Sequence, residues 1–301
     1  MKSTYNKLFL SALITFSLGF SLQAQTTIED IKTKLQDPEI DALYTKTYNT
    51  LLNRMDLDGY LPESLTGAYA GMYPRTTGAF VLLLIETERY EEAELNIKYV
   101  LDAVTQNNME RIPHVLERNK TIYSDEHQID GQAHVILAWA RLALKRGYTS
   151  FEDETWAQVS KLMARTCDRT FFQYGNWSIE PGLIKNIAFE HSRDFRRWDC
   201  WDLLTQSFVG ATLTDMMKVA EHYNATNLKN DWSRKRDILS EGIFSRVAYV
   251  QYQDNLHESF IRSFTDPHGQ SKLMKYQECA DQLNILAGGR TLLLVDGMNT
   301  P

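Results

Sequence analysis

Apolar residues recur at every third or fourth position over most of this 301-residue chain, and long runs of alternating apolar and polar residues are not found. Such spacing gathers the apolar side chains on one face of a helix. It predicts helices over residues 40–55, 76–87, 90–106, 130–146, 153–170, 199–223 and 231–248. The fold class that we expect is therefore all-α.

The connections between these helices alternate between short and long. Short links at 87–90, 147–153 and 224–231 predict antiparallel hairpins. The long loops at 56–75, 107–129 and 171–198 then fall on one side of those hairpins. This arrangement is typical of an (α/α)6 toroid, whose long loops gather at one rim and can build a site there. A helical solenoid is the alternative, but no fixed-period repeat supports it.

The chain after Val250 has a less regular pattern, with a candidate eighth helix over 271–287. A toroid of six hairpins needs twelve helices, so either the chain is incomplete at its C-terminus or its barrel is truncated. We take residues 25–301 as a single toroidal catalytic domain.

The first 24 residues have the features of a secretory signal peptide. Lys2 and Lys7 precede an apolar stretch from Leu8 to Leu22, and Ala24 provides a small residue for cleavage. The stretch is shorter than the ~20 apolar residues of a typical transmembrane helix. We expect cleavage near Ala24, no membrane span, and a periplasmic or secreted protein.

Charge and cysteine content narrow the possible partners. The formal net charge is -7, and the basic residues are interspersed with acidic ones, so binding to nucleic acid is not expected. The spacings of Cys167, Cys200 and Cys279 match no zinc or redox motif, and we interpret these residues as buried apolar positions. No metal and no cofactor is predicted.

The first candidate cluster lies where the loop at 56–75 enters a helix. Tyr73 and Arg75 flank Pro74, which suits the first position of a helix. Aromatic rings stack on the apolar faces of sugars, and Arg donates two hydrogen bonds at once, so both residues are candidates for binding a sugar substrate. The alternative is an ordinary helix start with an exposed Arg.

The second cluster is the segment 125–134. Asp130 is a candidate catalytic or hydroxyl-binding carboxylate, and His127 is a candidate substrate-binding residue; Asp130 as a plain N-cap is the alternative. Together with His134 these residues match no metal-ligand motif.

The third cluster, residues 177–202, is the densest in aromatic, Arg and acidic residues. Glu190 is its candidate catalytic carboxyl, because Asp199 and Asp202 are accounted for as acids at a helix start. The candidate substrate-binding residues of this cluster are Trp177, Arg193, Trp198 and Trp201.

The order of these clusters resembles that of the glucoamylase-type glycosidases, glycoside hydrolase family 15 and its relatives, within the six-hairpin superfamily. Residues 72–77 are similar to the family's Tyr-x-x-Arg-Asp segment, residues 128–138 to its Asp-Gly-x-Ala helix start, and residues 189–198 to its Trp-Glu-Glu segment. The resemblance implies that Arg75 and Asp130 hold substrate hydroxyls and that Glu190 is the general acid. It also implies a catalytic base in a late hairpin, for which Glu278 is the placeholder. Thr76 stands where the family has Asp.

These observations predict an exported glycoside hydrolase that cleaves oligo- or polysaccharides by carboxyl acid/base catalysis. One alternative is an unsaturated glucuronyl hydrolase or polysaccharide lyase, since Arg193, Arg196 and Arg197 are suited to bind a uronate carboxylate. The other is a non-catalytic sugar-binding or helical scaffold protein.

Overall fold

The computed structural model describes residues 33–64, 69–125, 129–171, 182–184, 186–190, 197–244, 247–252, 255–260, 263–264 and 271–272. The chain divides into two compact units, residues 1–54 and residues 55–301. The predicted eighth helix lies almost entirely outside the described residues.

The described part of the first unit contains helix α3, Pro38–Leu52. Its start follows from the local sequence, because Asp37 accepts a hydrogen bond of 2.9 Å from the backbone N–H of Glu39 and Pro38 occupies the first turn. The helix predicted over 40–55 is confirmed.

The described part of the second unit is dominated by six helices. They are α4 (Pro74–Glu86), α5 (Tyr90–Gln106), α6 (Ile129–Arg146), α7 (Ser150–Phe171), α8 (Leu203–His222) and α9 (Thr226–Phe244). Each matches a predicted helix, and the short links at 87–89, 147–149 and 223–225 join them into the three predicted hairpins.

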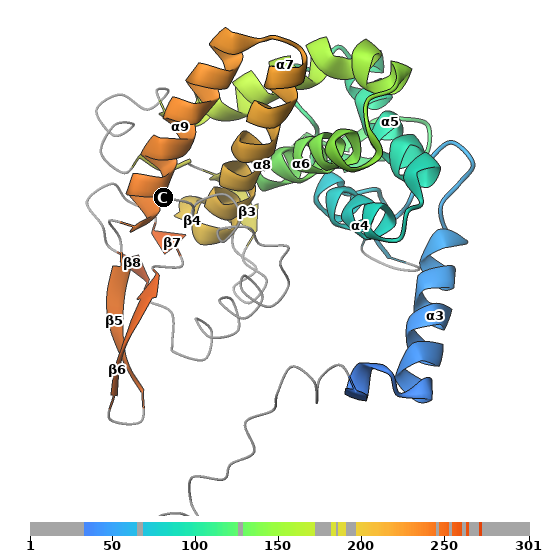
Figure 1. Cartoon of the computed structure of the whole chain (residues 1–301), viewed down its shortest axis with the longest axis horizontal. Helices are drawn as coiled ribbons and strands as arrows, with labels where there is room; N and C mark the ends of the chain where they lie inside the picture. The colour runs from blue at the N-terminus through green and yellow to red at the C-terminus, as the bar shows by residue number, and fades with distance from the viewer. Residues whose placement is uncertain are drawn as a thin grey trace, which may run out of the picture. The chain divides into compact units, whose positions relative to one another are not determined.

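Helices α4, α6 and α8 pack side by side as an inner row, and α5, α7 and α9 each pack against their hairpin partner (Figure 1). Because every inner helix is followed by one that returns, the three inner helices run in the same direction. Their N-termini, and the long loops that lead into them, therefore meet at one rim, as predicted.

The inner row is held together by a tight backbone approach and by polar contacts. A Cβ atom added at Gly78 of α4 would lie 2.6 Å from the backbone carbonyl carbon of His134 in α6. On the other side of α6, the Thr212 hydroxyl of α8 donates to the Ala133 carbonyl at 3.0 Å. Most of α6 is buried, including Trp139, so this helix forms the centre of the core.

The long loops contain short strands that the sequence did not predict. β1 (Val115–Leu116) and β2 (Ile122–Ser124) form a hairpin before α6. β3 (Asn186–Glu190) and β4 (Arg197–Asp202) pair before α8, in a four-stranded sheet completed by β7 (Ser263–Phe264) and β8 (Ser271–Lys272). β5 (Val247–Tyr252) and β6 (Asn255–Phe260) form a separate hairpin.

Because these strands occupy residues that were predicted to be helical, three predicted helix boundaries were wrong. The helix predicted from residue 199 begins at Leu203, because residues 197–202 form β4. The helix predicted to end at 248 ends at Phe244, and β5 begins at Val247. Ser271, expected to start a helix, lies in β8. Strands of two to six residues are too short to show a period, so the alternation that marks a strand was not visible.

Candidate functional site

The candidate site lies at the rim where the inner helices begin. The loop before α4 and the β1–β2 hairpin are joined by a pair of backbone hydrogen bonds between Met72 and Leu116, at 2.8 and 2.9 Å. β3 contacts α6, and β4 runs directly into α8. All three long loops therefore contribute to this rim.

A charge-assisted pair connects the first turns of two inner helices. Nη1 of Arg75 in α4 donates to Oδ2 of Asp130 in α6 at 3.1 Å. The Asp130 side chain is fully buried, whereas 38% of the Arg75 side chain is exposed. The buried carboxylate thus orients a guanidinium that still faces solvent. Asp130 lies within the first turn of α6, not ahead of it as the N-cap interpretation required.

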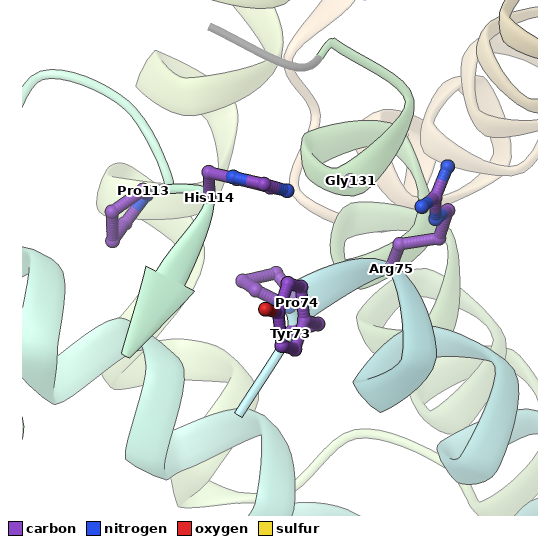
Figure 2. A pocket seen from close by; sticks show the side chains of 6 residues that line it. All are labelled: Tyr73, Pro74, Arg75, Pro113, His114 and Gly131. Atoms are coloured by element: carbon purple, nitrogen blue, oxygen red, sulfur yellow. The ribbon is translucent and has the colours of Figure 1, made fainter. Parts of the chain in front are cut away.

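A small open pocket of about 230 Å³, including space open to solvent, adjoins this pair. Its lining residues are Tyr73, Pro74, Arg75, Pro113, His114 and Gly131. Figure 2 shows the His114 ring pointing toward the first turn of α6 at Gly131, with Tyr73 and Pro74 at the start of α4. The pocket therefore offers aromatic rings and a cation, the chemical groups that recognise the apolar faces and hydroxyls of a sugar.

His134 supports the pair from within the core. Its Nδ1 lies 2.7 Å from the Asp130 carbonyl oxygen, so Nδ1 carries the proton and donates. Its ring stacks on Phe208 of α8 with the centroids 3.3 Å apart. Burial lowers the pKa of His134 to about 4, against the opposing influence of Asp130. A neutral His134 therefore bridges all three inner helices, since it also packs against Gly78.

The depressed pKa of His134 predicts a loss of stability in weak acid. The unfolded chain takes up a proton below pH ~6.5, whereas the folded protein does so only near pH 4, so the free energy of unfolding falls as pH decreases through this window. We expect wild-type protein to lose on the order of 1–2 kcal/mol more than His134→Asn between pH 7 and pH 5. Urea unfolding at both pH values measures this difference, with His222→Asn, an exposed histidine, as the control. An equal loss in wild type and His134→Asn would show that His134 does not contribute.

Two further polar atoms lie in the same helical turns. Oγ1 of Thr77 and Oε1 of Gln132 are buried and have no hydrogen-bond partner among the described residues. Buried polar atoms are nearly always paired with protein or bound water. Each of these two atoms therefore needs a bound water or a ligand hydroxyl to complete its hydrogen bonding.

The structure brings together only part of the predicted site. Tyr73, Arg75 and Asp130 lie at one place. His127, Trp177 and Arg193 lie outside the described residues, as does Glu278.

The remaining candidates lie in strands. Glu190, expected in a loop, is the last residue of β3, and its backbone is paired with Arg197 of β4. Trp198 and Trp201 belong to β4, where the backbone of Trp198 is paired with that of Phe189. The β3–β4 hairpin adjoins α6 and α8, which places these backbones on the same rim as Arg75 and Asp130.

Sequence reasoning missed Pro113 and His114, which line the pocket from the β1–β2 side. The available signal was their position in a long loop on the predicted rim. His114 is held by an edge-to-face contact with Tyr73, the ring centroids being 5.4 Å apart, and its Nδ1 lies 3.4 Å from the Ser124 hydroxyl.

The described residues also give information on the cysteines, on metal-ligand groups and on membrane-spanning helices. Cys167 is buried, as expected. Within the described part of the chain, His, Cys, Asp and Glu residues form no group of three that could hold a metal ion. The described helices include none with the length and hydropathy needed to cross a bilayer.

The arrangement of helices defines the fold class, and comparison with solved structures confirms it as the (α/α)6 toroid. One similar structure is a metal-independent α-mannosidase of Streptococcus pneumoniae in a non-productive complex with α-1,6-mannobiose. It aligns with a TM-score of 0.60 and 15% identity over 82% of this chain and 69% of its own. Another is a D-mannose isomerase, with a TM-score of 0.58 and 11% identity over 80% of this chain. The alignment spans 61% of the isomerase, less than two thirds of its length. No family model matches the sequence, and no curated protein does.

Proposed function

We propose that this protein is a glycoside hydrolase that binds the end of an oligosaccharide at the rim of its toroid. The observation that carries the proposal is the Arg75–Asp130 pair of 3.1 Å, which joins the first turns of two inner helices beside an aromatic pocket. A buried carboxylate at a helix N-terminus is stabilised by the helix dipole, and it fixes the guanidinium in one direction. Such a fixed donor suits recognition of sugar hydroxyls.

Glu190 is our candidate for the general acid. Its position at the end of β3, in a hairpin next to α6 and α8, is compatible with access to the same rim. The resemblance to glucoamylase-type enzymes supports this role. A general acid must hold its proton near neutral pH and deliver it to the leaving oxygen.

An α-mannoside is the substrate that we would test first. Two enzymes with this fold, one an α-mannosidase and one a mannose isomerase, act on mannose or its glycosides. The aromatic and cationic lining of the pocket is compatible with a neutral sugar. With the predicted signal peptide, the enzyme would act on glycans outside the cytoplasm.

Isomerisation of a free aldose is a second candidate, favoured by His114 in the pocket wall. Moving a proton between C1 and C2 of an aldose needs a base that titrates near neutral pH, and histidine is the usual one. Incubation with α-1,6-mannobiose and with mannose separates the candidates: a hydrolase releases mannose from the first, whereas an isomerase produces a ketose from the second. A uronate-bearing disaccharide, included in parallel, tests the glucuronyl hydrolase and lyase alternative.

The pair itself provides the test of substrate binding. Arg75→Lys and Asp130→Asn are each expected to reduce kcat/KM roughly ten- to hundredfold, the effect of losing one hydrogen bond to a charged group. Steady-state kinetics on α-1,6-mannobiose or an aryl α-mannoside, beside a thermal melt of each variant, measure the two effects separately.

The chain offers a matched control in a second pair between inner helices. Nε of Arg141 in α6 lies 3.0 Å from Oδ2 of Asp215 in α8, with 25% and 9% of their side chains exposed. Arg141→Lys and Asp215→Asn should alter stability and leave kcat/KM unchanged. A lower melting temperature for Asp130→Asn with unchanged kinetics would assign the Arg75–Asp130 pair to structure alone.

A further inference from the structure

Beside the pocket, an aromatic row extends along the loop that leads into α4. Tyr69 meets Tyr73 in an edge contact with the centroids 5.7 Å apart, and Tyr73 meets His114 at 5.4 Å. Tyr73 and His114 line the pocket, whereas Tyr69 does not. Tyr69 therefore continues the wall of the pocket onto the surface beside it.

Tyr69 is exposed in a way that leaves room for a partner. About half of the residue, 49%, is accessible to solvent, although it touches another aromatic ring. A single exposed aromatic residue is common on protein surfaces. What distinguishes Tyr69 is its contact with the wall of the candidate site.

The backbone around Tyr69 is fixed by hydrogen bonds to neighbouring segments. The Tyr69 carbonyl accepts from Ser64 N–H, and the Gly71 carbonyl accepts from Glu63 N–H, both at 2.9 Å. The Ala70 carbonyl accepts from the Tyr60 hydroxyl at 3.2 Å. A platform that is ordered before binding loses little conformational entropy when a ligand arrives.

The pocket is too small for a whole oligosaccharide. Its volume of about 230 Å³ includes space open to solvent, so a bound sugar lies across the mouth of the pocket and is not enclosed by it. A substrate of two or more sugar rings must therefore lie partly outside it. An aromatic face is the surface on which the apolar side of a sugar ring packs.

We infer that Tyr69 forms a second sugar-binding subsite, on which the ring next to the one at the pocket mouth stacks. The inference rests on the proposed function and deepens it, because it assigns a preference for disaccharides and longer chains over monosaccharides. The residues around the pocket mouth contact one ring, and Tyr69 supplies the contact that distinguishes a chain from a free sugar.

The experiment compares the affinities of mannose and α-1,6-mannobiose by calorimetry. Every variant carries Glu190→Gln so that the disaccharide is not cleaved during the titration. Tyr69→Ala should weaken mannobiose binding about three- to tenfold and leave mannose binding unchanged. Tyr69→Phe keeps the ring and should bind both sugars as the Tyr69 protein does.

Tyr123 provides the matched control, because it is a tyrosine of β2 that is 73% exposed. Successive residues of a strand point to opposite faces, and Ser124 points toward His114, so Tyr123 points away from it. Tyr123→Ala should leave both affinities unchanged.

The other outcomes overturn the inference. Equal weakening of both sugars by Tyr69→Ala would make Tyr69 a support for the pocket, and no weakening of either would remove it from the site. If the protein with Tyr69 intact binds neither sugar, the mannoside function fails as well. If mannose binds but α-1,6-mannobiose binds no more tightly than mannose, the second subsite is wrong and the mannoside function stands.

Discussion

Glu190→Gln is expected to reduce kcat on a natural oligosaccharide by about 10²- to 10⁴-fold, the usual contribution of a general acid. An alkoxide leaving group departs slowly unless it is protonated, and glutamine has no proton to transfer. An aryl glycoside with an activated phenolate leaving group needs no such help. The same variant should therefore retain most of its activity on the aryl substrate, and the ratio of the two rates is the measurement.

A matched control for this charge change is Glu117→Gln. Glu117 is an exposed residue beside the β1–β2 hairpin, and its carboxylate accepts a hydrogen bond of 3.0 Å from the Thr121 hydroxyl. It should leave both rates unchanged. Equal loss on the two substrates in Glu190→Gln would assign Glu190 to binding or structure. Full activity on both would move the acid to another carboxyl of the region, and Glu180, Asp194 and Asp199 would be examined next.

The helical part of the fold was predictable because each helix is long enough to show its period. Over the 17 residues of α5, apolar residues return to the same face several times, so the pattern is unambiguous. The alternation of short and long links then indicated which ends of the helices share a rim. That step placed Arg75 and Asp130 near each other although 55 residues separate them in sequence.

The strands could not be predicted in the same way. β4 reads Arg-Trp-Asp-Cys-Trp-Asp, and its acids were interpreted as helix-start residues. Its strand conformation depends on pairing with β3 and β7, and β7 lies far from β4 in the chain. Propensity for strands reflects that context more than the residue itself.

The residues that form the wall of the pocket could not be identified from the sequence either. His114 follows a proline in a long loop and belongs to no motif, so only tertiary structure shows that it faces Tyr73. Gly78 looked like one more residue of an apolar helix. A side chain at position 78 is excluded because the His134 backbone lies so close. The spacing of apolar residues carries no information about such a contact between helices.

Gly78→Val is expected to destabilise the protein and to disable the site together. An added Cβ would lie 2.6 Å from the carbonyl carbon, the Cβ and the carbonyl oxygen of His134, and two of these are backbone atoms that cannot rotate away. Overpacking of this kind typically costs ~1–3 kcal/mol. The cost is relieved only if α4 moves away from α6.

That movement would separate the two helices whose first turns hold Arg75 and Asp130 at 3.1 Å. Gly78 lies three residues after Arg75 in α4, and His134 donates a hydrogen bond to the backbone carbonyl of Asp130. The displacement would therefore occur about one helical turn from the Arg75–Asp130 pair. A misplacement of about 1 Å in a positioned group can reduce a rate about 10²-fold. We therefore expect kcat/KM to fall by that order, together with the free energy of unfolding in urea.

Gly131→Ala is the control for stability. A Cβ at Gly131 would meet Arg75 only at ordinary contact distances, 3.6 Å from its backbone nitrogen and 4.0 Å from its Cβ. Alanine is favoured over glycine in a helix by ~1 kcal/mol, so this variant should be as stable as wild type or more stable. Gly78→Ala, with a smaller side chain, should show the same loss as Gly78→Val to a lesser degree. Wild-type stability and activity in Gly78→Val would mean that the α4–α6 approach does not set the geometry of the Arg75–Asp130 pair.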